Sequence, residues 1–452
     1  MSNLLSLLGM GSSAISAQNS GIATTTNNVA NVNTVGYSRE TTELQSLQGP
    51  PLAGGVTSGA TSRAVSDLLS ARVRTSNGSL ASSQALSAGL SDVENSLTSG
   101  TTIDQRVATM FSMLDQVSAS PTDKTLRDAA VSAAQSVVSS LHDAAGSVTS
   151  ARSDADSQIG TITTQATALA NQLAAANKAV ASGDPTALDR RDQLANQLSQ
   201  LVGGQGQIDS KGQMRFVLDG GAVLVDGNRA SSMTTTPDPT TGLATVHVTD
   251  GGSTRDVTSQ IGSGQLGGVL ALRSSLTATL GQYDQYASDL ATSFNSVATA
   301  HAGADGVSGR NMFVPPAGVA GAAAALQLDP GLAANSDQLA TAAVGGAAGS
   351  NAGAVALFAL AHQPVAGGGK RTLTDAALDI TASIGEQTSS AKANATGDQI
   401  VSNHLGDLRD SISGVDIQEE TTNLSKYEAA TSAMTKFVSS IDQMLSSLIQ
   451  NI

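Results

Sequence analysis

Apolar residues recur at seven-residue intervals at both ends of the chain. Near the N-terminus, small residues such as Ala14 and Ala17 lie between the large apolar ones. Near the C-terminus, two such series run three positions apart, so both seam positions of each heptad are filled. This spacing is typical of helices that pair as coiled coils. The N-terminal series is Met1, Leu8, Ile15, Ile22 and Val29. The first C-terminal series is Ile417, Leu424, Thr431, Val438, Leu445 and Ile452. The second C-terminal series is Tyr427, Met434, Ile441 and Leu448.

Each terminal stripe needs a partner, because an isolated amphipathic helix in water draws most of its stability from packing its apolar face. We predict that the first and last helices pair with each other, and then with the same helices of neighbouring subunits. The residues of these series would then form an assembly interface, and the ends would be largely disordered before assembly. An intramolecular helical hairpin in a monomer explains the pattern equally well.

The middle of the chain contains further helical patterns. Apolar residues alternate in threes and fours from Leu86 to Leu97, from Ile103 to Val117 and from Ile159 to Val180. A new helix is predicted to start with Asp184 as N-cap and Pro185 at the first helical position, and to run to about Val202. The helical period returns from Val269 to Val297 and from Leu373 to Leu408.

Two segments of the middle break this helical pattern. From Gly203 to about Ile261 the period is two, and turn residues separate short strands, which predicts a small inserted antiparallel β unit. Residues 302–369 are rich in Gly and Ala, and such low side-chain diversity predicts an outer subdomain of mobile loops without a firm core.

The predicted fold is therefore mainly α, elongated and discontinuous, with an inserted antiparallel β domain and with the terminal helices paired as a coiled coil. Residues 1–40 and 412–452 would form the terminal coiled-coil domain. Residues 41–202, 266–301 and 371–411 would form a discontinuous helical bundle domain. Residues 203–265 would form the β domain, and residues 302–370 the Gly/Ala-rich outer subdomain or loops.

Composition narrows the function classes. Among 452 residues there is no Cys or Trp and aromatic residues make up 2%, so disulfides and thiolate sites are excluded and burial must come from Leu, Val, Ile and Ala. The formal net charge of -14 opposes binding to nucleic acid. The first residues lack a basic region and an Ala-x-Ala site, so we expect no ordinary secretory signal, and we expect no membrane insertion. These features alone would place the protein in the cytosol.

The sequence offers little material for catalysis. The five His residues are scattered, and Asp143, Asp154 and Asp156 lack the glycine of a calcium loop, so we expect no metal site. The GSGQLG string at Gly262, Gly264 and Gly267 matches a dinucleotide-binding pattern, but the preceding strands read as antiparallel, which favours a flexible return to the bundle. We therefore expect no catalytic or cofactor-binding residues and no cofactor; a nucleotide-dependent enzyme is the alternative, which calorimetry with dinucleotides would test.

One short segment carries a specific family motif. The string NNVANVNTVGYSRE, from Asn27 to Glu40, resembles the signature of the rod, hook and hook-associated axial proteins of the bacterial flagellum. The C-terminal segment, with Gly414, Glu419 and Glu420 before the heptads, is similar to the matching end of that family. The segment from Ala187 to Gly203 resembles the hook-associated branch. The motif positions are Asn28, Ala30, Asn31, Asn33, Thr34, Gly36 and Tyr37.

The resemblance implies a structural subunit at the hook–filament junction, with the hook or another axial protein of the same family as the alternative. It implies self-association into a ring or helical array, and contacts with the hook protein and with the second hook-associated junction protein, FlgL. It also implies unfolded export through the flagellar type III channel, with the chaperone FlgN on the C-terminal helix, and an extracellular location. A chain that has no disulfides, and whose terminal helices become ordered only on binding a partner, is suited to export in an unfolded form.

Overall fold

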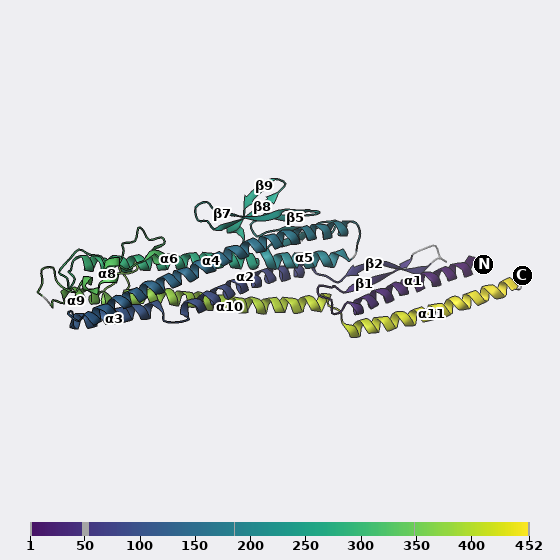
Figure 1. Ribbon diagram of the computed structural model, residues 1–452. Helices are drawn as coiled ribbons and strands as arrows, with labels where there is room; N and C mark the ends of the chain where they lie inside the picture. Colours follow the sequence, from purple (N-terminus) through teal and green to yellow (C-terminus); the bar gives the residue numbers. More distant parts are fainter. Residues whose placement is uncertain (1, 48–53, 185, 348, 451–452) are drawn as a thin grey trace.

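The protein is an elongated, mainly helical molecule in which both termini lie at one end (Figure 1). The computed structural model describes residues 2–47, 54–184, 186–347 and 349–450. Two terminal helices, α1 (Ser2–Ala30) and α11 (Ile417–Gln450), lie beyond a bundle of long helices. The bundle helices are α2 (Asp67–Thr98), α3 (Ile103–Ala119), α4 (Lys124–Ala181), α5 (Ala187–Val202), α6 (Gly264–Thr299) and α10 (Leu373–Ser413).

The terminal helices pair side by side in antiparallel orientation. Gly11 of α1 lies against Val438 of α11, and Gly21 lies against the ring of Tyr427. The buried seam of α1 consists mainly of small side chains, because only these allow the two backbones to approach closely. The buried residues on all sides of α1 are Gly11, Ala14, Ala17, Gly21, Thr25 and Asn28, of which Gly11 and Gly21 contact α11.

The heptad residues predicted as an assembly interface take different places in this pair. On α1, Leu8, Ile15, Ile22 and Val29 are half-buried at the margins of the small-residue seam. On α11, Ile441 is buried, whereas Ile417 and Leu448 are 51% and 43% exposed. The other heptad residues of α11 are half-buried: Leu424, Tyr427, Met434, Val438 and Leu445. Met1 and Ile452 lie outside the described residues. The coiled-coil geometry and the assembly role stay predictions.

A β-hairpin follows the terminal helix where the sequence analysis placed the start of the helical domain. Strands β1 (Glu40–Leu47) and β2 (Gly55–Arg63) pair antiparallel, with a register shift between Thr42 and Leu44. The hairpin lies on α1, where the hydroxyls of Thr24 and Thr42 are 2.6 Å apart. The expectation of helical structure from residue 41 is therefore wrong over this stretch, because its Thr-rich segments prefer extended backbone. The bundle helices begin at Asp67, after Ser66 caps α2.

The predicted helical seams form the core of the bundle. Ile103, Val107, Met110, Leu114 and Val117 of α3 are all buried, as the spacing predicts. Helix α4 is 58 residues long, which corresponds to about 87 Å at 1.5 Å per residue. Helix α5 starts at Ala187, close to the predicted boundary, while Asp184 accepts hydrogen bonds from Thr186 and Pro185 lies outside the described residues.

The predicted antiparallel β insertion is confirmed, and it consists of two small sheets packed on α4. The first has the order β3 (Gln205–Ile208), β4 (Met214–Val217), β5 (Val223–Asp226) and β6 (Arg229–Ala230). The second has the order β7 (Ser232–Pro237), β8 (Ala244–Asp250) and β9 (Ser253–Asp256), followed by the short helix η1 (Thr258–Gln260). The buried Asn177 of α4 holds the first sheet by donating to the carbonyls of Met214 and Gly227.

The Gly/Ala-rich region has a firm core, contrary to the sequence expectation of mobile loops. Asn295 of α6 accepts from the backbone N–H groups of Met312 and Phe313, and Asp284 accepts from those of Gly321 and Ala323. Phe313 is buried edge-on to Phe294. A few large apolar anchors and two buried acceptors thus order a segment whose composition is otherwise uniform. Its short helices are α7 (Ala322–Ala325), α8 (Pro330–Ala334), η2 (Ser336–Gln338), α9 (Ala352–Ala359) and η3 (Leu360–His362).

The small-residue seam of the terminal pair can be tested at Gly21. A Cβ atom at this position would lie 2.8 Å from the ring of Tyr427, so we expect Gly21→Val to destabilise the pair by about 1–3 kcal/mol through overpacking. Hydrogen exchange of the α1 and α11 amides would measure the loss. Gly9→Val is the matched control, because no atom lies within 4 Å of that Cβ position. Equal effects of the two substitutions would contradict the seam.

Candidate functional site: the joint between the terminal helices and the bundle

Three segments that the sequence analysis singled out meet at one place in the fold. The motif after α1, the start of α5 and the start of α11 converge where the terminal helices adjoin the bundle (Figure 1). We call this region, residues 28–40, 63–74, 187–196 and 409–420, the joint. Segments far apart in sequence contribute to it, so pattern reasoning identified its parts but not their contact.

Asn28 organises the motif that follows α1. Its side chain is 1% exposed and makes three hydrogen bonds: Oδ1 accepts from the N–H of Glu40 (2.9 Å) and the hydroxyl of Tyr37 (2.8 Å), and Nδ2 donates to the carbonyl of Glu40 (2.8 Å). The carboxamide therefore imitates a peptide group and joins the end of α1 to the first residue of β1. This explains why the motif needs Asn at this position.

The remaining motif residues shape the turn between Asn28 and Tyr37. Asn31 donates to the carbonyl of Asn27, and the hydroxyl of Thr34 donates to Asn31, which ends the helix. Gly36 has φ of +84°, a conformation that favours glycine. Ala30 and Asn33 are exposed, so in this subunit their side chains leave the turn facing outward.

Arg39 connects the turn to the start of α11. Its Nε lies 2.9 Å from Glu420, which is 2% exposed, and its Nη2 contacts Glu419 at 2.5 Å. The backbone N–H of Arg39 donates to the carbonyl of Ser413, at the end of α10. Glu419 and Glu420 also lie in the first turn of α11, where negative charge stabilises a helix. One residue thus fixes both helices that meet at the C-terminal side of the joint.

Arg63 connects the hairpin to α5. Its Nη2 lies 2.5 Å from Asp189 and 2.8 Å from Asp192, and it donates to the hydroxyl of Ser38. The backbone N–H of Ser38 donates to Asp189. Arg191 completes the group by donating to Asp192 at 2.6 Å. The segment from Ala187 that resembles the hook-associated branch therefore supplies the acidic half of this ion-pair group.

The charges and the burial of the joint keep the hydrogen-bonding side chains of Tyr37 and Arg39 in one protonation state. Burial, followed by the negative charges of Glu40, Asp189 and Glu420, raises the pKa of Tyr37 well above its usual value, so its hydroxyl remains a donor to Asn28. Burial tends to lower the pKa of Arg39, but its contacts with Glu419 and Glu420 outweigh this and raise it. Both groups keep their proton at any physiological pH.

The other candidates for chemistry lie elsewhere and do not form a site. Within the described ranges, no three metal-ligating side chains come together. Gly264 has φ of +70°, and a Cβ there would lie 2.3 Å from the backbone of Gly203. Gly264 of the GSGQLG string therefore permits a close crossing of two chain segments at the return from the β domain. Of the helices in the described residues, none has the length and hydrophobicity needed to cross a membrane.

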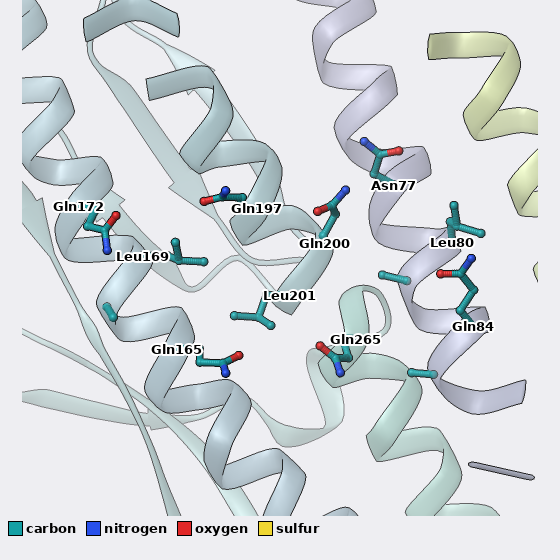
Figure 2. Close-up of a pocket in the computed structure, with 13 residues that line it drawn as sticks. Asn77, Leu80, Gln84, Gln165, Leu169, Gln172, Gln197, Gln200, Leu201 and Gln265 are labelled. Atoms are coloured by element: carbon teal, nitrogen blue, oxygen red, sulfur yellow. The ribbon is translucent and has the colours of Figure 1, made fainter. Parts of the chain in front are cut away.

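A groove of about 880 Å³ lies between α2, α4, α5 and the first turn of α6 (Figure 2). Carboxamides face it from several helices, and the described residues that line it include no charged side chain. It offers no acid, base or metal ligand and so no basis for catalysis. Its lining is Asn77, Leu80, Ala81, Gln84, Ala85, Gln165, Ala168, Leu169, Gln172, Gln197, Gln200, Leu201 and Gln265.

Two family models match this chain, and each covers one of the segments that resemble the flagellar family. The model of the flagellar hook-associated protein FlgK helical domain matches residues 90–313, and the model of the flagella basal body rod protein matches residues 8–37. The second match includes most of α1 and the motif positions from Asn28 to Tyr37.

Individual proteins agree with these family models. Flagellar hook-associated protein 1 of Bacillus subtilis is 24% identical to this chain over 96% of each of the two sequences. The protein of the same name from Escherichia coli is 27% identical over 68% of this chain and 60% of the Escherichia coli sequence. The fold resembles the structure of the flagellar hook junction protein FlgK from Burkholderia pseudomallei, with a TM-score of 0.69, 18% identity, and coverage of 77% of this chain and all of that one. The chain therefore belongs to the FlgK family, the hook-associated structural proteins of the bacterial flagellum at the hook–filament junction.

Proposed function

We propose that this chain forms a ring or helical array through its terminal helices and thereby joins the distal hook to the filament. The observation that carries the proposal is the outer face of α11. Phe437, Met444 and Leu448 are spaced at helical intervals and are 39%, 46% and 43% exposed. Antiparallel pairing with α1 leaves this apolar face uncovered, and an apolar stripe of this kind favours association with further helices.

Neighbouring subunits would cover this face and stabilise the terminal pair. A pair of helices covers only one side of each, so its stability in a solitary subunit depends on a narrow seam and on the joint. We propose that the pair is the least stable part of the free subunit and becomes fully ordered in the array. The hook protein and the second junction protein FlgL are the proposed neighbours along the axis.

The same apolar face of α11 also supports export through the flagellar type III channel with the chaperone FlgN bound to the C-terminal helix. The apolar face of α11 that would contact other subunits would be the one that a chaperone has to cover before assembly. The chain contains no Cys, so no disulfide has to be broken for threading through a channel. We propose a purely structural role without enzymatic activity, at the extracellular flagellum.

The proposed assembly face can be tested by replacing its three exposed apolar residues together. We expect the Phe437→Ser, Met444→Ser, Leu448→Ser variant to lose binding to isolated hooks but to keep its helix content, because all three side chains are partly exposed and Phe437 only borders Gly11 at the edge of the seam. Circular dichroism and cosedimentation with hooks, followed by electron microscopy, would measure the two properties. The matched control replaces the exposed Ser439, Ser440 and Ser446 of α11 with Ala. Normal hook binding by the triple Ser variant would exclude this face.

The joint can be tested at Asn28. We expect Asn28→Ala to leave the N–H and carbonyl of Glu40 without partners and to cost about 1–3 kcal/mol of local stability. Faster hydrogen exchange at Glu40 and a loosened hairpin should result. Asn33→Ala, at an exposed motif position, should change stability by less than about 0.5 kcal/mol. Similar exchange in the two variants would refute the organising role of Asn28.

A further inference from the structure

In the described part of the chain, one buried arginine of the joint has a guanidinium nitrogen without a hydrogen-bond partner. Arg74 of α2 is 3% exposed, and its Nε has no hydrogen-bond partner among the described residues. The neighbouring carboxylates Asp189 and Asp192 form their ion pairs with Arg63 and Arg191. Burial lowers the pKa of Arg74, and the attraction of Asp192 offsets this only in part. Because arginine does not give up its proton in proteins, the charge remains and needs compensation.

Arg74 lines a small, partly open cavity of about 30 Å³. Five segments of the joint meet around it: the turn after α1, the end of β2, the first turns of α2, the helix α5 and the end of α10. A cavity of this size holds one or two groups as small as a water molecule. Its lining is Gly36, Ser38, Arg63, Val65, Ser70, Val73, Arg74, Asp192, Gln193, Asn196, Arg409 and Ser413.

The carboxylates near the cavity are already paired with other arginines. Asp192 accepts from Arg63 and Arg191, at 2.8 and 2.6 Å. Asp189 pairs with Arg63 at 2.5 Å. Among the residues that the structure describes, these pairs leave Arg74 without an ion-pair partner of its own, and the attraction of Asp192 compensates its charge only in part.

The remaining charges around the cavity do not change this balance. Arg409, the third arginine of the lining, lies 3.5 Å from Asp410. Asp67 attracts Arg74, but its side chain is exposed and its effect on Arg74 is weaker than that of Asp192. A chain with a net charge of -14 therefore holds a buried positive surplus at this position.

We propose that this cavity binds a single halide-sized anion, chloride in a physiological medium. A monoatomic anion fits the volume. The guanidinium of Arg74 would supply charge-assisted hydrogen bonds, and the hydroxyls of Ser38 and Ser70 could donate further ones. Water could fill the same space but would not compensate the charge of Arg74.

A bound anion would connect the segments that surround it. Ser38 belongs to the turn after α1, Arg74 to α2 and Arg409 to α10, so these elements would share one counter-charge. Removal of the anion would weaken the attachment of the terminal pair to the bundle without affecting the distal core. The joint would then respond to the type of salt as well as to its concentration.

The anion site can be tested by hydrogen exchange and thermal unfolding of the full chain. The protein would be compared in sodium chloride and in sodium gluconate at equal ionic strength, since gluconate is too large for the cavity. We expect saturable protection by chloride at the amides of residues 36–39 and 70–74. Arg74→Gln should abolish the difference between the salts. The matched control, Arg72→Gln, lies two residues away on the exposed side of α2 and should retain it.

A second measurement uses the unaltered protein, so the proposal stays testable if Arg74→Gln fails to fold. Crystals grown in sodium bromide should show an anomalous peak within hydrogen-bond distance of the Arg74 guanidinium. A peak at the same position in the Arg72→Gln protein would support the assignment. Bromide peaks confined to the outer surface, or water alone in the cavity together with equal stability in both salts, would overturn it.

Discussion

The attachment of the terminal helices depends on two arginines that each bind a pair of carboxylates. The chain passes between the terminal pair and the bundle only through the turn after α1, the hairpin and the short link from α10 to α11. Arg39 fixes this link through Glu419 and Glu420, while Arg63 fixes the hairpin through Asp189 and Asp192. These ion pairs are partly buried, so salt screens them less than exposed pairs, and removal of one partner would leave an uncompensated charge. They therefore determine the direction in which the terminal pair leaves the bundle.

The rest of the molecule is held together by small and medium-sized side chains rather than by large rings. The 452 residues include only six Phe and four Tyr. Three of the Phe form one cluster, in which the ring centres of Phe111 and Phe313 each lie 5.8 Å from that of Phe294. Elsewhere, Ala and Gly permit close helix approach, and the many contacts made along long helices replace the contribution of aromatic rings. An elongated shape follows, because such contacts accumulate along a seam rather than around a centre.

The sequence predicted the elements with a strong period and missed those that depend on a few anchors. The seams of α3 and α4 and the period-two strands of the β domain were recognisable, because burial on one face repeats at regular intervals. The β1–β2 hairpin has few large apolar residues, so its alternation is weak. The order of the Gly/Ala-rich region depends on Asn295 and Asp284, which belong to a helix outside it.

The joint illustrates the same limit at the level of the site. The motif around Asn28 and the segment around Asp189 were both singled out from sequence, yet 161 residues separate these two positions and no periodicity relates them. On α1, large apolar residues such as Leu8 and Ile15 gave the visible heptad signal, whereas Gly11 and Gly21 form the contact with α11. A glycine seam is hard to predict, because glycine carries no side chain that marks its burial.

The adjacency of the two termini has a consequence for how the family can vary. Because the first and last helices lie at one end, the chain between the hairpin β1–β2 and α11 extends away from them and returns (Figure 1). Insertions and deletions in the β domain or at the distal tip therefore change the outer profile without disturbing the register of the terminal pair. The same layout makes the distal loops, which lie farthest from the terminal pair, suitable attachment points for foreign peptides.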